Sequence, residues 1–311
     1  MRRGERDSVL DLLERAFPGQ RDLFARYMKT DPALHDSDTL LVFDGERPVS
    51  CVQIFTKQIR LRGETVALGG IGSVGTDPDY RRRGLARSLL VEAAADMERR
   101  GMALALLFGD EKLYQRLGWV ALPRTWLSIH ALEQPPAVLD GLRIRPFEPA
   151  DLPSVCELYD SYCRDLDGTT VRDAEYWRGQ LRYAGDPDEI FRVAERAGRI
   201  VAYLRIASPP GVLLMEHARE QAAADALIAL VLDSIPEGKA LVAMPGPDAE
   251  LEELARGAGA RVDSITDTSM MWRVLNANKL TRLAGTRWSA PTLLESLVSA
   301  PRALYWPSDR F

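Results

Sequence analysis

The sequence is poor in the residues that build disulfides and metal centres. It has three cysteines and three histidines in 311 residues. The cysteines Cys51, Cys156 and Cys163 are odd in number and show no metal-ligand spacing, and the histidines are scattered along the chain. We therefore expect reduced thiols, a cytoplasmic location and no metal site.

Long hydrophobic runs and an excess of positive charge are absent as well. No apolar segment reaches the length of a membrane span, and the first residues (MRRGERDSVLDLLERAF) include acidic side chains and no signal-peptide core. The formal net charge of −5 argues against a nucleic-acid partner and suits a cationic substrate. We expect neither membrane nor nucleic acid as a partner. The length favours two domains.

The most informative stretch is residues 65–101 (TVALGGIGSVGTDPDYRRRGLARSLLVEAAADMERRG). An apolar run ends at residues 76–78 (TDP), where the proline stops strand pairing. From Leu85 to Met97, apolar residues recur at three- and four-residue spacing, which predicts a helix with one buried face. The N-terminus of this helix offers unpaired N–H groups and the positive end of a dipole beside several arginines. Such an end is suited to binding an anion such as diphosphate.

Two phosphate-binding patterns compete for this stretch. Residues 70–75 spell G-x-G-x-x-G, but residues 76–78 separate them from the helix and Asp96 lies inside the helix, so the context of a dinucleotide fold is missing. We expect these glycines to lie in the strand and to permit a bulge. Residues 81–86 (RRRGLA) spell R-x-x-G-x-A directly before the helix, where a cradle of backbone amides is required.

The run from Val74 to Tyr80, followed by R-x-x-G-x-A, resembles the acetyl-CoA motif of the GNAT superfamily of N-acetyltransferases. Further along, residues 113–119 (LYQRLGW) resemble the Y-x-x-x-G-[FW] segment of the same family. The alternative interpretation is a solvated basic helix start with a core tyrosine. The resemblance implies an α/β fold in which a mixed, mostly antiparallel twisted sheet is flanked by helices. It also implies acetyl-CoA as the cosubstrate.

The resemblance gives individual residues a place in the cofactor site. Backbone N–H groups of Val74 and Thr76, on either side of Gly75, would bind the pantetheine and the thioester oxygen. The diphosphate would be held by amides and guanidinium groups of Arg81, Arg82, Arg83, Gly84, Leu85, Ala86 and Arg87. Gly109 and Asp110, after the next strand, would flank the cofactor near the carbonyl.

Two residues are implied in catalysis. Tyr114 is the candidate general acid, because a phenol at this position can protonate the departing sulfur. The alternative is an aromatic ring that packs with Leu113 and Leu117. Phe311 ends the chain, and the resemblance implies that its terminal carboxylate helps to deprotonate the amine. The alternative is that Trp306 and Phe311 merely anchor the tail in an apolar groove.

The chain divides into a catalytic GNAT domain at residues 1–132, a linker at 133–141, a second domain at 142–275, and a helix with an aromatic tail at 276–311. The second domain repeats the element order of the first, so we expect two tandem GNAT folds. Residues 218–222 (AREQA) lack the arginine run and the glycine. We therefore expect the second domain to wall the substrate cleft without binding CoA.

Further expectations concern the strands and the end of the chain. Trp119–Leu122 and Trp126–His130 should complete the first sheet, and Ser264–Leu275 should be the final strand region of the second. The ending D-R-F after two GNAT units resembles the enhanced intracellular survival (Eis-like) acetyltransferases, with their third domain shortened. That family resemblance also implies a homo-oligomer.

The predicted function is acetyl-CoA-dependent transfer of an acetyl group to a primary amine, directly within a ternary complex. The acceptor would be a small molecule or a peptide amine, such as an aminoglycoside, a polyamine or a lysine side chain. The alternative is a non-catalytic module that senses CoA or acyl-CoA. Tyr114 together with a complete diphosphate loop favours the enzyme, and a nucleotide-binding dehydrogenase is a distant third.

Overall fold

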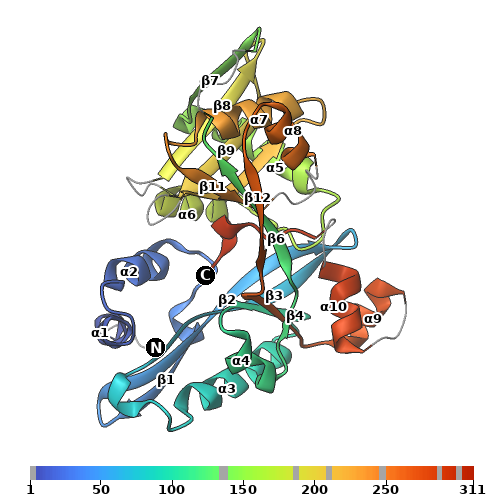
Figure 1. Cartoon of the computed structure of the whole chain (residues 1–311). Coiled ribbons are helices and arrows are strands. Elements are labelled where there is room, and N and C mark those ends of the chain that lie inside the picture. Colours follow the sequence, from blue (N-terminus) through green and yellow to red (C-terminus); the bar gives the residue numbers. More distant parts are fainter. Residues whose placement is uncertain are drawn as a thin grey trace.

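The computed structural model describes residues 5–132, 139–184, 189–207, 212–244, 250–285, 289–298 and 303–311. They form two mixed, mostly antiparallel sheets, each flanked by helices, and one lies above the other in Figure 1. Each sheet with its helices is called a unit below. The predicted fold class is confirmed.

The first sheet has the strand order β1-β2-β3-β4-β13-β5. Its strands are β1 (Thr39–Asp44), β2 (Arg47–Leu61), β3 (Glu64–Thr76), β4 (Leu104–Phe108), β13 (Met270–Val274) and β5 (Val120–Ala121). The helices packed around it are α1 (Arg6–Ala16), α2 (Arg21–Thr30), α3 (Leu85–Arg99), α4 (Glu111–Tyr114), α9 (Ala277–Ala284) and α10 (Ala290–Val298). One apolar core lies between the sheet and α3, and another lies between the opposite face and α10.

The second sheet has the order β12-β6-β11-β10-β9-β8-β7. Its strands are β12 (Val262–Asp267), β6 (Arg124–His130), β11 (Ala240–Ala243), β10 (Val212–Arg219), β9 (Arg199–Ala207), β8 (Glu189–Arg196) and β7 (Leu142–Pro146). The helices of this unit are α5 (Leu152–Cys163), α6 (Ala174–Ala184), α7 (Ala224–Asp233) and α8 (Leu251–Gly257). Apolar residues of α7 and α8 cover one face, and those of α5 cover the other.

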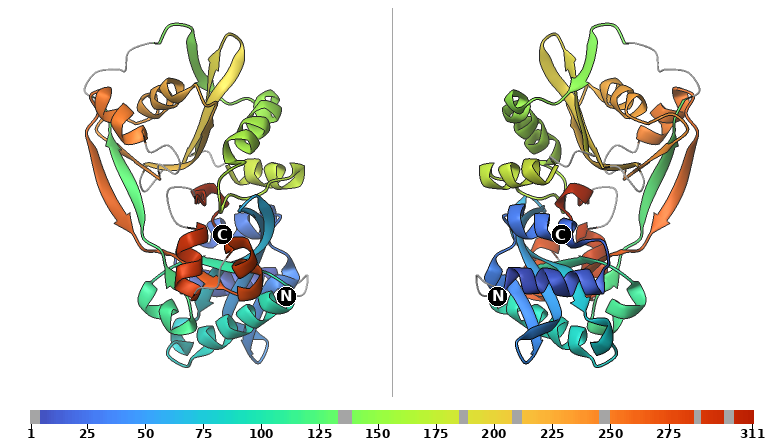
Figure 2. Two further views of the ribbon diagram at one scale, coloured as in Figure 1. Left: turned by 90° about the vertical axis from the view of Figure 1, so that its right-hand side faces the viewer. Right: turned by 90° about the vertical axis from the view of Figure 1, so that its left-hand side faces the viewer.

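The two units exchange a strand, which the sequence does not predict. Trp126–His130 was expected in the first sheet, but β6 lies in the second sheet between β12 and β11. Ser264–Leu275 was expected as one region, but it contributes the end of β12 to the second sheet and β13 to the first. Alternation identifies a strand but not its neighbours, so both errors concern pairing. Figure 2 shows β6 (green) and β12 (orange) running side by side from the second unit to the first.

The exchange means that strands cross the expected domain boundary. The division at residues 132 and 142 stays a prediction, and most of the expected linker at 133–141 lies outside the described residues. The tail, which we define as Ala303–Phe311, is docked against the rest of the protein, since Tyr305 and Trp306 are buried. It includes the short helix η5 (Pro307–Asp309) and ends between the two units (Figures 1 and 2). Within the described residues, no helix combines the length and hydrophobicity needed to cross a bilayer.

Candidate active site

The strands β3 and β4 run parallel and then part. They pair from Leu68 opposite Leu104 to Ile71 opposite Leu107. Beyond this point β3 continues to Thr76, whereas β4 ends at Phe108. The edge of β3 that carries Val74, Gly75 and Thr76 therefore has no β4 partner for its backbone groups.

The same part of β3 contains the predicted bulge. Cys51 pairs with Gly75 and Gln53 pairs with Gly72, so two residues of β3 face one residue of β2. Ser73 within the bulge has φ +48°, a left-handed conformation that few non-glycine residues adopt. The bulge turns the backbone of β3 away from a regular ladder where it leaves β4.

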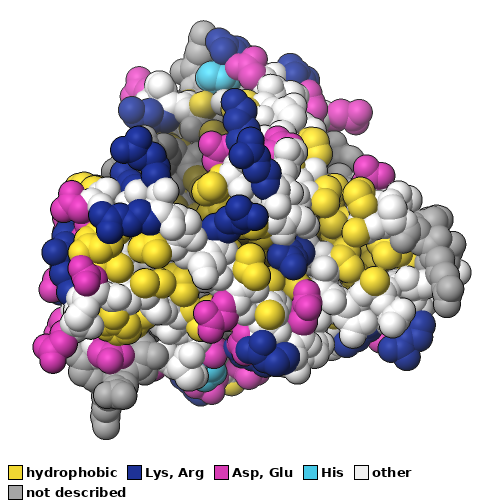
Figure 3. All heavy atoms as spheres, turned by 90° about the horizontal axis from the view of Figure 1, so that it is seen from below, with side chains coloured by type: hydrophobic (Ala, Val, Ile, Leu, Met, Phe, Trp, Pro, Cys, Tyr) yellow, Lys and Arg dark blue, Asp and Glu magenta, His cyan; other side chains and the backbone are white. Residues whose placement is uncertain are grey.

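Helix α3 begins at Leu85, after the turn of residues 77–84 that follows β3, and no side chain caps its first amides. Gly84 is the N-cap residue, has φ +78°, and supplies no side-chain cap. The first turn of α3 contains no acidic residue, and Arg82 and Arg87 are exposed. Seen from the side of α3 and α4, Lys and Arg side chains gather across the middle of the molecular surface (Figure 3). An uncapped helix N-terminus among arginines has the charge and the donors that bind a phosphate group.

A buried carboxylate supports the turn between β3 and α3. Asp77 accepts hydrogen bonds from Arg15 Nε at 2.7 Å, from Arg47, and from the N–H of Asp79 at 3.1 Å. Burial opposes its ionisation, but these donors together hold the pKa of Asp77 below its usual value. The turn is therefore tied to α1 and β2 by a charged side chain.

Tyr114 lies at the end of β4, on the short helix α4. Its ring packs into the apolar core under α3 with Leu117, and a Cβ added to Gly109 would lie 2.4 Å from its Cε2. Burial, and secondarily the charge of Asp110, raise the pKa of the phenol, so it is neutral at physiological pH. No residue in the described ranges hydrogen-bonds its hydroxyl. The ring packs as the alternative interpretation expects, while the hydroxyl keeps its proton and its donor capacity.

Phe311 contacts strand β3, on the face of the first sheet opposite to the face that Tyr114 packs against. Its ring stacks on Phe55 with centroids 5.4 Å apart and lies 5.9 Å from the ring of Phe108. A Cβ added to Gly70 would come within 2.4 Å of the Phe311 ring, and one added to Gly72 would lie 3.0 Å from the terminal carboxyl carbon. The end of the chain thus lies on β3 where that strand parts from β4.

Comparisons with known proteins agree with this geometry. The sequence profile of the Acetyltransferase (GNAT) domain family matches residues 1–121. Residues 1–121, the N-terminal part of the first unit, are a GNAT acetyltransferase domain. The match confirms the predicted enzyme class. A comparison with curated proteins gave no match.

Solved structures resemble both GNAT-like units together. A probable N-acyltransferase from Enterococcus faecalis V583 has a TM-score of 0.70 and 19% identity, covering 88% of this chain and 71% of that chain. A GCN5-related N-acetyltransferase from Kribbella flavida has a TM-score of 0.69 and 19% identity, covering 90% and 71%. Eis1 from Mycobacterium abscessus has a TM-score of 0.65 and 17% identity, covering 91% and 74%. At these identities the likeness shows the tandem fold.

Residues of the second GNAT-like unit hold the tail in a buried ionic cluster. Arg172 donates to Asp309 at 2.9 Å and to Glu216 at 2.7 Å, and all three side chains are fully buried. Tyr176 donates to Asp309 at 2.9 Å, and the hydroxyl of Ser308 bonds both Arg172 and Glu216. Arg172 and Arg205 hold the pKa of Glu216 down at about 2, against the effect of burial. The position of the tail therefore depends on the second unit.

Lys57 of the GNAT domain holds the tail from the other side. This lysine of β2 is buried, and its ammonium group donates to the carbonyl of Asp309 and to the hydroxyl of Tyr176. Burial lowers the pKa of Lys57, and the charges of Asp31 and Asp309 act against this. Sequence reasoning missed Lys57, Arg172 and Glu216. A lysine within the apolar run of β2 was the one available signal.

The tail also contacts the second sheet at the point where its parallel strands β10 and β11 part, as β3 and β4 do in the first sheet. There β10 pairs with β11 in parallel at Val212 and Leu213 and then continues to Arg219. Beyond the pairing, the ring of His217 lies 4.8 Å from Trp306, which packs in one apolar cluster with Met244 just after β11. The tail thus contacts the part of β10 that corresponds to the edge of β3 beyond its pairing with β4.

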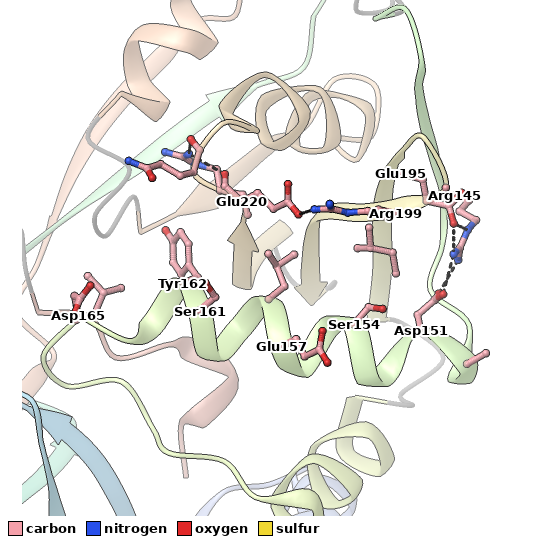
Figure 4. A pocket seen from close by; sticks show the side chains of 17 residues that line it. Arg145, Asp151, Ser154, Glu157, Ser161, Tyr162, Asp165, Glu195, Arg199 and Glu220 are labelled. Carbon is pink, nitrogen blue, oxygen red and sulfur yellow. Dashed lines mark hydrogen bonds and ion pairs between the residues drawn. The ribbon is translucent and has the colours of Figure 1, made fainter.

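A separate cleft of about 980 Å³ opens in the second unit between α5, the β8–β9 hairpin and the end of β10 (Figure 4). Within it, Arg145 bonds both Asp151 and Glu195 at 2.6 Å, and Arg199 bonds Glu220. The cleft lies apart from β3, Tyr114 and Phe311, so it is not part of the candidate active site. Among the described residues, no group of three or more His, Cys, Asp and Glu side chains is arranged to hold a metal ion.

Proposed function

We propose that this protein is an acetyl-CoA-dependent N-acetyltransferase that transfers the acetyl group directly to a primary amine. One observation carries the proposal: the uncapped, acid-free N-terminus of α3 comes one short turn (residues 77–84) after the segment of β3 that has no β4 partner. The first feature suits a diphosphate, and the second offers backbone N–H groups to a pantetheine chain and a thioester oxygen.

The loop residues fit the cosubstrate. Gly84 adopts φ +78° with nothing within 4 Å of an added Cβ, so its backbone is open to a ligand. Amides of residues 84–87 and the side chains of Arg82 and Arg87 would hold the diphosphate, and Val74 and Thr76 would bind the pantetheine arm. Acetyl-CoA supplies the thioester carbonyl that the amine attacks.

Two protons must move during the transfer. The amine nitrogen forms a bond to the acetyl carbon, the carbon–sulfur bond breaks, the amine loses a proton and the sulfur gains one. We assign the first proton to the terminal carboxylate of Phe311, because it lies on β3 where the strands part. We assign the second to Tyr114, whose raised pKa keeps the phenol a proton donor at physiological pH.

Thiol release from acetyl-CoA, measured with a panel of amines and without amine, tests the proposal. We expect release that depends on the amine and that falls on deletion of Phe311, with the affinity for acetyl-CoA unchanged. Acetyl-CoA binding without turnover on any amine would favour the alternative, a CoA-binding sensor. Absence of acetyl-CoA binding would refute the assignment of residues 81–87.

A further inference from the structure

A small cleft of about 270 Å³ opens beside the tail, lined by Trp126, Leu213, Val242, Ile265, Asp267, Ser269 and Arg310. It lies where β10 parts from β11, because Leu213 and Val242 are the last paired residues of those strands. It also borders the proposed reaction centre. The carbonyl of Ser269 accepts from the N–H of Gly109 at 2.9 Å, and Arg310 immediately precedes Phe311.

Arg310 is a charged side chain in this cleft that has no polar side-chain partner among the described residues. Its guanidinium carbon lies 4.4 Å from the ring centroid of Phe108 and 5.6 Å from that of Trp126. Its Nε is buried with no hydrogen-bond partner, and no carboxylate of the described residues lies within ion-pair distance. By contrast, the buried guanidinium groups of Arg172 and Arg205 each form an ion pair with a carboxylate.

The other polar groups around the cleft do not offset this charge by direct contact. The indole N–H of Trp126 is buried and has no hydrogen-bond partner. The carboxylate of Asp267 accepts hydrogen bonds from the N–H of Ser269 at 3.1 Å and from the hydroxyl of Ser269 at 3.0 Å. Burial lowers the pKa of Arg310, and the negative charge of Asp267 opposes this without a contact. An anionic group in the cleft would therefore supply the counter-charge that the guanidinium of Arg310 lacks among the described residues.

We propose that this cleft binds the acetyl acceptor, and that Arg310 recognises a carboxylate carried by the same molecule as the amine. The inference rests on the proposed function. The apolar walls formed by Trp126, Leu213 and Val242 suit an aliphatic or aromatic body, and the volume limits its size. The acceptor class is thus a small hydrophobic amine that bears a carboxylate, such as an amino acid, rather than the polycation that the net charge suggests.

Matched pairs of acceptors test the inference. Leucine and phenylalanine are each compared with their carboxamides, so that only the negative charge differs. The comparison uses kcat/KM in the natural chain, in Arg310→Gln, and in the control Arg256→Gln, whose exposed guanidinium pairs with Glu252. We expect the acid-over-amide ratio to fall by about tenfold to a hundredfold in Arg310→Gln alone. An unchanged ratio, or an effect confined to the KM of acetyl-CoA, would overturn the inference.

Binding without turnover separates this inference from the proposed function. Calorimetry with 3-phenylpropanoate and its carboxamide reports on the cleft independently of acetyl transfer. We expect tighter binding of the carboxylate, lost in Arg310→Gln and weakened in Arg310→Lys, which keeps the charge but not the forked donors. Such binding without transferase activity would leave the site standing and the function refuted. Turnover of amines with no preference for a carboxylate would support the proposed function and refute the carboxylate site.

Discussion

The substitution Asp309→Asn tests how the tail is held. It keeps the shape of the side chain but removes the charge that Arg172 meets at 2.9 Å and that Tyr176 meets at 2.9 Å. Hydrogen bonds to charged groups are worth about 1.5–3 kcal/mol each, and breaking a buried ion pair costs about 3–5 kcal/mol. Because Arg172 keeps Glu216 as a partner at 2.7 Å, we expect a loss at the low end, about 3 kcal/mol.

Denaturant unfolding and native proteolysis measure the effect. The matched control is Asp225→Asn, which breaks an exposed pair with Arg196 and should cost at most about 1 kcal/mol. A carboxypeptidase that removes C-terminal aromatic residues should release Phe311 from folded Asp309→Asn faster than from the control. Amine-dependent turnover should fall while the KM of acetyl-CoA stays constant. Equal stability and equal Phe311 release in the two variants would refute the claim that this cluster holds the tail.

Three further outcomes are expected. Tyr114→Phe should lower turnover by about a hundredfold or more without changing acetyl-CoA affinity, and equal turnover would remove Tyr114 from the mechanism. Gly84→Ala should raise the KM of acetyl-CoA by about tenfold, whereas Gly45→Ala, which carries the same positive-φ strain of about 1 kcal/mol in open space, should not. The depressed pKa of Glu216, about 2 against an ordinary 4.5, stabilises the fold above about pH 4.5. That contribution, about 3 kcal/mol, should disappear as the pH falls toward 2 and should be absent from an acid titration of Glu216→Gln.

The amino-acid sequence by itself determined the local elements of the proposed cofactor site. Residues 65–101 form a strand, a turn and a helix because alternation, Pro78, Gly84 and helical spacing act between residues close in the chain. The bulge at Ser73 and the uncapped start of α3 follow from the same neighbours. For this reason the uncapped end of the helix could be predicted without a structure.

Only the tertiary structure decided which distant residues meet. Strands β6 and β13 exchange sheets, because pairing depends on packing across the whole molecule and not on periodicity within a strand. Lys57 meets Asp309 across 252 positions, and Arg172 meets it across 137. The low dielectric of the core makes such buried charges costly unless they are paired, so folding brings them together there. The location of Phe311 on β3 depends on these long-range pairings, which cannot be predicted from the residues close to it in the sequence.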